Sequence, residues 1–134
     1  SSILVKDQSG NTWFIDGAGN INVTAPKKFT VNAGENITMT AGKNVTVSAG
    51  DDMDNSAGKN ITQTAGNDLS QSAMGNITEM SNNRTEMVEK DFIRQADTSN
   101  EIASEVTIFS QKENMTLQSG KTVEVNSAEK SKMF

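Results

Sequence analysis

The chain has 134 residues, the length of a single domain. Aromatic residues make up only 4% of it and the net charge is −5, so an ordinary globular core would be thin and a basic nucleic-acid-binding face is disfavoured. Because the chain has no cysteine and no histidine, disulfides, thiolate metal sites and the commonest general base are excluded. No apolar run approaches the roughly 20 residues that span a bilayer, and no secretory signal is evident.

The N-terminal segment predicts a hairpin. Two apolar triplets, Ile3-Leu4-Val5 and Trp13-Phe14-Ile15, flank the turn sequence Asp7-Gln8-Ser9-Gly10-Asn11, an arrangement typical of two antiparallel strands. A second turn sequence at residues 16–20 leads into a different pattern. We therefore expect residues 1–16 to form a hairpin that serves as a junction, with Trp13 as its packing anchor.

An eight-residue repeat runs through residues 17–126. The first position is alanine in seven consecutive blocks, at residues 25, 33, 41, 49, 57, 65 and 73. The fifth position is apolar in eight blocks: Ile21, Phe29, Ile37, Val45, Met53, Ile61, Leu69 and Ile77. The seventh position is apolar in the first four blocks: Val23, Val31, Met39 and Val47. Repetition at this level predicts one structural unit per block.

Each block predicts a short β-strand followed by a corner. Residues two apart share one face of a strand, so the fifth and seventh positions form a dry face and the sixth and eighth face away. Glycine at the second position, as in Gly34, is expected to supply a backbone conformation that other residues adopt only at a cost. Asn or Asp at the fourth position, as in Asn36, is expected to bond nearby backbone. The fold class predicted is all-β: an octad-repeat triangular β-helix, or β-solenoid.

Charged residues at the third position fit a stacked arrangement of blocks. They run Lys27, Glu35, Lys43, Asp51, Lys59, with Asn67 next, so adjacent blocks mostly alternate in sign. At a strand spacing of roughly 4.8 Å they would form exposed ladders, each pair contributing about 0–1 kcal/mol. Simple solubility explains these charges equally well.

The seventh position turns polar after Val47. If the strand phase holds, Asn55, Gln63, Gln71 and Glu79 point at the axis of the coil. Stacked amides can satisfy one another, whereas a buried Glu79 needs a partner or water. We expect a partly hydrated or ion-containing interior here. The alternative is that these strands tilt and expose the position.

The repeat becomes irregular between residues 81 and 105, where glycine disappears and charges increase. Thr85 with Met87, and Ile93 with Gln95, still fit the earlier frame. The repeat then returns with a slip of two residues, which a bulge or longer corner explains most simply and a short helical insertion explains less simply. The predicted core accordingly continues at Met115, Leu117, Val123 and Val125. Residues 127–134 are expected to form a tail.

Two assemblies are compatible with this pattern. One chain could use three blocks for each turn of a coil, or three chains could each contribute one block to every layer. The alternation of charge fits both assemblies, because block n opposes block n+1 and block n+3 alike.

The run from Gly19 to Gly50, which contains Glu35-Asn36-Ile37-Thr38-Met39-Thr40 and its neighbours, resembles the C-terminal needle of VgrG, the spike protein of bacterial type VI secretion systems. It is similar also to the central spikes of contractile phage tails. The resemblance covers essentially the whole chain and is strongest over residues 17–80 and 113–126. It implies an intertwined homotrimeric β-helix rather than an enzyme, with no cofactor beyond ions or water inside the needle.

The resemblance also implies partners and a place of action. It implies a PAAR-type tip protein at the C-terminal end and tube proteins reached through base domains that the sequence lacks. It implies assembly in the bacterial cytoplasm, followed by export across a target membrane. By position alone, the last repeat holds the expected tip-partner contacts: Thr122, Glu124 and Asn126.

Other classes of protein remain as alternatives. Outward threonine pairs, such as Thr38 with Thr40, resemble the flat arrays of ice-binding solenoids, although Asp54 and Met80 interrupt the array. An adhesin stalk would share the repeat but would lack a tip partner. An enzymatic β-helix would need long side loops, and none is evident. The Asp51-Asp52-Met53-Asp54 cluster lacks the spacing of calcium-binding solenoids and is expected to be solvated surface.

Overall fold

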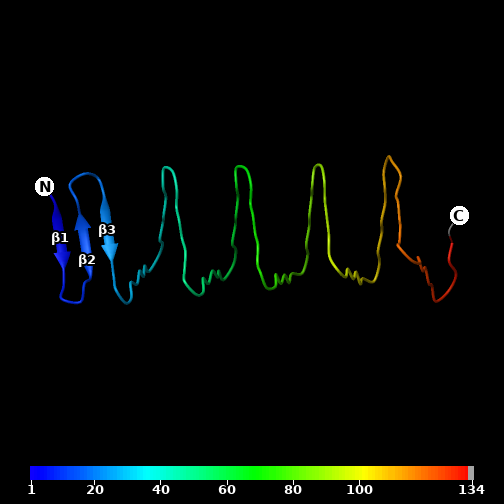
Figure 1. Ribbon diagram of the computed structural model, residues 1–134, viewed down its shortest axis with the longest axis horizontal. Helices are drawn as coiled ribbons and strands as arrows, with labels where there is room; N and C mark the ends of the chain where they lie inside the picture. The colour runs from blue at the N-terminus through cyan, green and yellow to red at the C-terminus, as the bar shows by residue number, and fades with distance from the viewer. Residues whose placement is uncertain (133–134) are drawn as a thin grey trace. The chain divides into compact units, whose positions relative to one another are not determined.

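The computed structural model describes residues 1–132, and all of their regular secondary structure is β. Strands β1 (Ile3–Lys6), β2 (Thr12–Ile15) and β3 (Ile21–Thr24) form one antiparallel sheet in the order β1-β2-β3 (Figure 1). These described residues include no helix, and so no helix that could cross a bilayer. The chain is therefore all-β, as predicted. Two units can be distinguished, Ser1–Gln71 and Ser72–Phe134, and the sheet belongs to the first.

The loop between β1 and β2 is closed by one aspartate. Asp7 Oδ1 accepts hydrogen bonds from the backbone N–H groups of Ser9 and Asn11, each at 3.0 Å, and Asp7 Oδ2 accepts one from Asn11 Nδ2 at 2.9 Å. Gly10 has a φ of +94°, which glycine adopts without steric cost. The predicted hairpin is therefore present and closed by local polar contacts.

The loop between β2 and β3 repeats this design. Asp16 Oδ1 accepts hydrogen bonds from the backbone N–H groups of Ala18 at 2.6 Å and Asn20 at 3.1 Å, and Asp16 Oδ2 accepts one from Asn20 Nδ2 at 2.6 Å. Gly19, with a φ of +100°, corresponds to Gly10. The first strand of the octad repeat is thereby paired with β2, so the sheet has three strands instead of the two expected.

One face of this sheet is apolar throughout. Val5 lies opposite Trp13, and Trp13 lies opposite Val23. Ile3, Ile15 and Ile21 form a second row in the same way. Because side chains two apart share a face, both rows lie on one side of the sheet. The opposite side carries the remaining strand residues: Leu4, Lys6, Thr12, Phe14, Asn22 and Thr24.

Beyond Thr24 the backbone is extended and bends at regular intervals (Figure 1). Through the regular blocks the bends recur every eight residues, at 26–27, 34–35, 42–43, 50–51, 58–59, 66–67 and 74–75. Within residues 25–132 no backbone N–H donates to a backbone carbonyl of the same chain. The blocks are thus extended segments separated by corners, and none is paired with another segment of its own chain.

The predicted role of glycine at the corners is wrong. Positive φ values occur at Gly10, Gly17 and Gly19, and at none of the seven glycines from Gly34 to Gly120. The chain also bends at Met74 and Asn82, which occupy the same place in their blocks. These corners are built from backbone conformations open to any residue. The predicted turn contacts of Asn36 and its equivalents are likewise absent from the hydrogen bonds of residues 1–132.

The irregular stretch keeps its bends but changes their spacing. They fall at residue 82, at 89–90, at 97–98, at 104 and at 111–113, before the regular spacing resumes at 120–121 and 128–129. The slip of two residues comes mainly from shortened intervals, not from a longer corner, and no helix is inserted. Residues 133 and 134 of the expected tail lie outside the described residues.

The frame predicted for Met87 and Ile93 is also wrong. Their side chains are 91% and 86% exposed, whereas the neighbouring Val88 and Phe92 are 52% and 56% exposed. The lower pair matches the fifth and seventh positions of regular blocks, so the less exposed positions lie one residue after Met87 and one residue before Ile93. Apolar residues occur at both parities in this stretch, which is why alternation alone selected the wrong pair.

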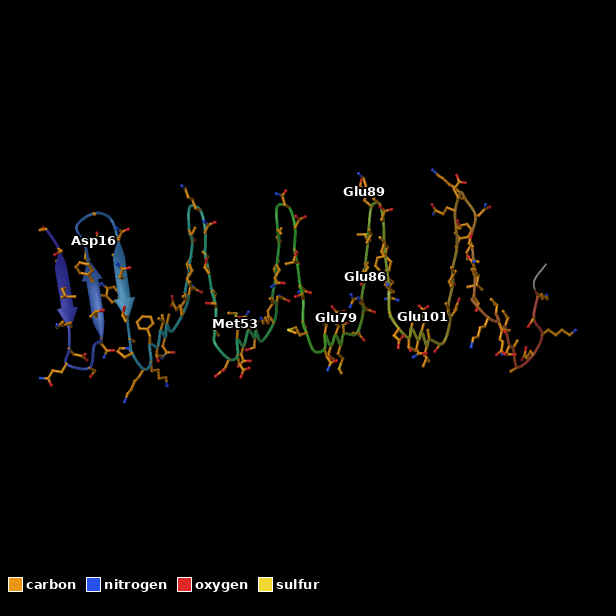
Figure 2. All side chains as sticks on the ribbon, in the orientation of Figure 1. Asp16, Met53, Glu79, Glu86, Glu89 and Glu101 are labelled. Carbon is orange, nitrogen blue, oxygen red and sulfur yellow. The ribbon has the colours of Figure 1, made fainter. Side chains whose placement is uncertain are left out.

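Neither unit encloses a core of its own. Among the described residues no side chain is buried, apolar or polar. Figure 2 shows the side chains projecting from the extended backbone along its course. The chain exposes 15199 Å² of surface, whereas a compact monomer of 14.3 kDa exposes about 6,800 Å² and an unfolded chain about 21,000 Å². The chain therefore buries much less surface than a compact monomer of its mass.

Candidate functional site

The main candidate site is the row of apolar side chains at the fifth and seventh positions, here called the octad stripe. Its members are 42–75% exposed, and none lies in an enclosed core. The stripe comprises every predicted core residue: Ile21, Phe29, Ile37, Met39, Val45, Val47, Met53, Ile61, Leu69, Ile77, Met115, Leu117, Val123 and Val125. Because large contiguous apolar surfaces mark interaction sites, the stripe is a candidate interface.

The stripe occupies one side of the backbone. Met74 and Met80, which stand at the second and eighth positions, are almost fully exposed. The stripe residues are less exposed, although no other described segment packs against them. This is expected if they lie on the inner side of each corner. The sidedness of the blocks therefore follows the alternation in the sequence.

The polar residues that continue the stripe at the seventh position differ in their side-chain contacts. Asn55, Gln63 and Gln71 are exposed and make no side-chain hydrogen bond within the described part of the chain. Glu79 forms an ion pair with Arg84. The interior position predicted for these residues stays a prediction, since no described segment of the chain encloses them.

Arg84 is a functional candidate that sequence reasoning missed. It forms ion pairs with both Glu79 and Glu86, and its Nε also donates to Glu86 Oε1 at 2.9 Å; both carboxylates are labelled in Figure 2. One guanidinium thus pairs with two carboxylates where the block spacing changes. The signal was available: an inward Glu79 requires a partner, and Arg84 is the first cation that follows it.

A second basic side chain in this stretch contacts an aromatic ring. The guanidinium carbon of Arg94 lies 5.7 Å from the centre of the Phe92 ring, within the range of a cation–π contact. Arg94 and Phe92 are two residues apart and so share a face of the extended segment. Phe92, unlike Ile93, takes the less exposed side of this block.

The expected tip contacts lie in the last complete block. Thr122, Glu124 and Asn126 are exposed between the bends at 120–121 and 128–129, and they alternate with the stripe residues Val123 and Val125. Their side chains therefore face away from the stripe. Their contact with a tip protein remains a prediction.

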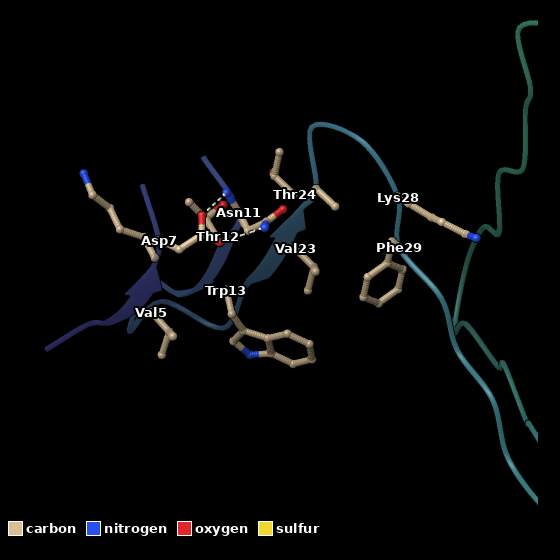
Figure 3. A pocket seen from close by; sticks show the side chains of 11 residues that line it. Val5, Asp7, Asn11, Thr12, Trp13, Val23, Thr24, Lys28 and Phe29 are labelled. Carbon is tan, nitrogen blue, oxygen red and sulfur yellow. Dashed lines mark hydrogen bonds between the residues drawn. The ribbon is translucent and has the colours of Figure 1, made fainter. Parts of the chain in front are cut away.

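The N-terminal sheet bears a shallow hollow of about 360 Å³. Val5, Trp13, Val23 and Phe29 project into it from the same side of the backbone, and Lys28 stands at its edge (Figure 3). Its wall is mainly apolar and open to solvent. Within residues 1–132 no three acidic side chains converge as ligands for a metal ion, so Asp51, Asp52 and Asp54 form no such group.

Local hydrogen bonds perturb two carboxylates of this sheet. The pKa of Asp7 is lowered, chiefly because the side chain and backbone of Asn11 donate to it. The pKa of Asp16 is lowered in the same way by the Asn20 side chain and then by the backbone of Ala18. Both shifts favour the charged form that closes the loop, so they indicate structural rather than catalytic carboxylates.

The fold and site define the class of an all-β chain with an eight-residue bend period and an exposed apolar stripe. Comparison with protein-family models, with curated proteins and with solved structures gives no match.

Proposed function

We propose that the chain is the needle of a bacterial cell-puncturing spike of the VgrG type, in which three copies wind into a triangular β-helix. The observation that carries this proposal is the octad stripe, which stays exposed while residues 1–132 form no core of their own. A threefold arrangement would bring identical stripe residues, such as Ile37 and Val45, together at each layer. The resemblance of residues 17–80 and 113–126 to such needles supplies the biological setting.

The unpaired backbone favours three chains over a coil made by one. In a single-chain coil each block would pair with the block three further on, and the N–H and C=O groups would be satisfied within the chain. Residues 25–132 make no backbone–backbone hydrogen bond of their own, yet backbone polar groups require partners when they leave water. Neighbouring copies at roughly 4.8 Å spacing would supply them.

The exposed surface supports the same assignment. The excess over a compact monomer is about 8,400 Å² for each chain, far more than the roughly 800 Å² that each partner contributes to a standard protein–protein interface. Such an excess exceeds what one standard interface could cover. Intertwining with copies of itself would bury it without any other component.

Mechanical stiffness would follow from this arrangement. Each chain would advance to the next face of the prism with every block and rise about 4.8 Å, so roughly thirteen blocks would form a shaft on the order of 60 Å. Every strand would pair above and below with other chains, leaving no long lateral strand edge. A shaft of this kind transmits axial force with little bending, which is what puncture of a membrane requires.

The polar positions at Asn55, Gln63 and Gln71 would hold water or ions along the axis of the shaft, since amides leave water only when hydrogen-bonded.

The two ends of the shaft would have different tasks. The last block, with Thr122, Glu124 and Asn126, would receive a PAAR-type tip protein. The N-terminal end would join the tube of the contractile apparatus. Deleting residues from Thr122 onward should then abolish binding of the tip protein, and retained binding would remove this assignment.

The mass of the particle in solution tests the assembly. Light scattering should give about 43 kDa, three times the 14.3 kDa of one chain. Ile37→Asp should abolish that mass because three carboxylates would meet at a dry axis, whereas Thr38→Asp, one residue along and on the outer face, should preserve it. A wild-type particle of 14.3 kDa, or equal behaviour of the two variants, would overturn the proposal.

A chimeric spike tests the function itself. In a bacterium whose own type VI spike lacks its needle, a spike carrying this chain should restore killing of neighbouring cells. The Ile37→Asp chimera should fail, and the Thr38→Asp chimera should succeed. A trimeric chain that gives no killing in the chimera would keep the assembly but remove the puncturing role in favour of a static stalk.

A further inference from the structure

The apolar side of the N-terminal sheet is a surface that the repeat does not explain. It is defined by Ile3, Val5, Trp13, Ile15, Ile21 and Val23, here called the N-terminal apolar face. Trp13 at its centre is 47% exposed, and Val5 beside it is 64% exposed. No segment of residues 1–132 covers this face, although it holds the only tryptophan of the chain.

This face is continuous with the octad stripe. Ile21 and Val23 are residues of β3 and are also the fifth and seventh positions of the first block. The β2 residues directly opposite them in the register are Ile15 and Trp13. Any assembly that turns Ile21 and Val23 towards a shared axis therefore turns Ile15 and Trp13 towards it as well.

The hollow on this face has the form of a site for apolar side chains. Val5, Trp13, Val23 and Phe29 provide its apolar lining (Figure 3), and Phe29 is the fifth position of the second block. The lining also includes polar residues: Lys6, Asp7, Asn11, Thr12, Thr24 and Lys28. The hollow thus spans the junction between the sheet and the repeat. The apolar part of this lining would match the same apolar face of another copy.

We propose that the N-terminal apolar face docks against the same face of two further copies and that this contact sets the register of the three chains. The inference rests on the proposed threefold needle and adds a dedicated element to it. Each copy contributes β3, β2 and β1 as one face of the prism, so this end is built from pairing within chains. Beyond Ala25 the pairing passes between chains.

Register is a physical problem that the repeat cannot solve alone. Neighbouring blocks are so similar that a chain displaced by eight residues still presents apolar side chains to the axis, as Ile37 replaces Phe29 or Val45 replaces Ile37. Weakly specified strands of this kind are prone to slippage. The three-stranded sheet occurs once among the described residues and is closed by its own loops. A displaced chain would bring a block opposite a sheet and leave Trp13 uncovered.

The experiment compares two neighbouring residues of β1 in the full chain. Val5→Asp places a charge on the N-terminal apolar face, whereas Leu4→Asp places it on the opposite side of the same strand. Lys59→Cys, in a chain with no cysteine of its own, carries a spin label on an outer corner. Double electron–electron resonance then reports the label-to-label distances among the copies, and acrylamide quenching reports the exposure of Trp13.

The wild-type chain should give one narrow distance distribution and a Trp13 quenched several-fold less than in denaturant. Val5→Asp should broaden the distances and expose Trp13, whereas Leu4→Asp should leave both unchanged. A trimeric wild type whose Trp13 is fully quenched, or a Val5→Asp variant with the wild-type distances, would overturn the register role and leave the needle intact. A monomeric wild type would overturn both proposals.

Discussion

Asn20 donates to Asp16 from both its backbone and its side chain, and the same relationship joins Asn11 to Asp7. The two loops share the pattern Asp-x-x-Gly-Asn at residues 7–11 and 16–20. Each carboxylate accepts hydrogen bonds from loop N–H groups that would otherwise bond only to water. The three-stranded sheet is therefore held by two copies of one local device.

Removing one of these carboxylates should loosen the sheet. We expect Asp16→Ala to lower the thermal midpoint, measured by circular dichroism, because three donors lose their acceptor. Asp16→Asn, which keeps an oxygen acceptor, should lose less. Asp54→Ala is the control, since Asp54 accepts no hydrogen bond within residues 1–132. A midpoint for Asp16→Ala equal to that of the control would show that the loop contributes nothing.

The same carboxylates predict a dependence on pH. The folded-state pKa values of Asp7 and Asp16 lie below their ordinary value of 3.8. Their stabilisation is therefore fully present above that value and is lost as the pH falls through the lowered folded-state values. As the pH drops below 3.8, we expect the thermal midpoint of the wild type to fall more steeply than that of the Asp7→Asn, Asp16→Asn double variant. Parallel curves would contradict this.

The two kinds of glycine should respond differently to a methyl group. Gly19 has a φ of +100° and Gly34 has no φ in the left-handed range, and an added Cβ meets nothing within 4 Å at either. Gly19→Ala should therefore cost roughly 1–3 kcal/mol through backbone strain alone. Gly34→Ala should be neutral or stabilising by about 0.4–1 kcal/mol, since it restricts the unfolded chain. Chemical denaturation measures both, and equal losses would indicate crowding at the octad corners instead.

The surroundings of Arg84 decide how much its ion pairs contribute to the free energy of unfolding. An ion pair left in solvent contributes about 0–1 kcal/mol, whereas breaking an enclosed pair costs about 3–5 kcal/mol. If Glu79 faces the axis, Arg84→Met should show the larger loss in chemical denaturation. Arg94→Met is the matched control, because Arg94 contacts Phe92 and forms no ion pair in the described chain. If Arg84→Met lowers the free energy of unfolding by less than about 1 kcal/mol, Glu79 lies on the surface.

Much of the local structure could be predicted because it depends on near neighbours in the sequence. The turn chemistry of Asp7 to Asn11 and the apolar triplets beside it predict the hairpin, and the octad predicts a corner every eight residues. The octad pattern does not predict the pairing of β3 with β2, because Ile21 and Val23 also fit the fifth and seventh positions of the repeat. The second Asp-x-x-Gly-Asn loop lies directly before them. That loop was the available signal for a third strand.

Other features could not be read from the pattern for physical reasons. Glycine permits many conformations, so its presence at Gly34 does not reveal which one the corner uses. Val88 follows Met87 and Ile93 follows Phe92, so alternation selects no inward side in that stretch. The ion pair of Arg84 depends on how far the chain advances between bends, which composition does not fix.

The lack of any enclosed side chain in the described residues has a consequence for biosynthesis. If three copies enclose the octad stripe as proposed, a single polypeptide gains little of that apolar burial alone and cannot offset the entropy of ordering its backbone, so maturation of each newly made chain would wait for contact with others. Its yield should rise with the rate of synthesis and fall on dilution. Crowding many ribosomes on one messenger would therefore hasten the production of finished particles.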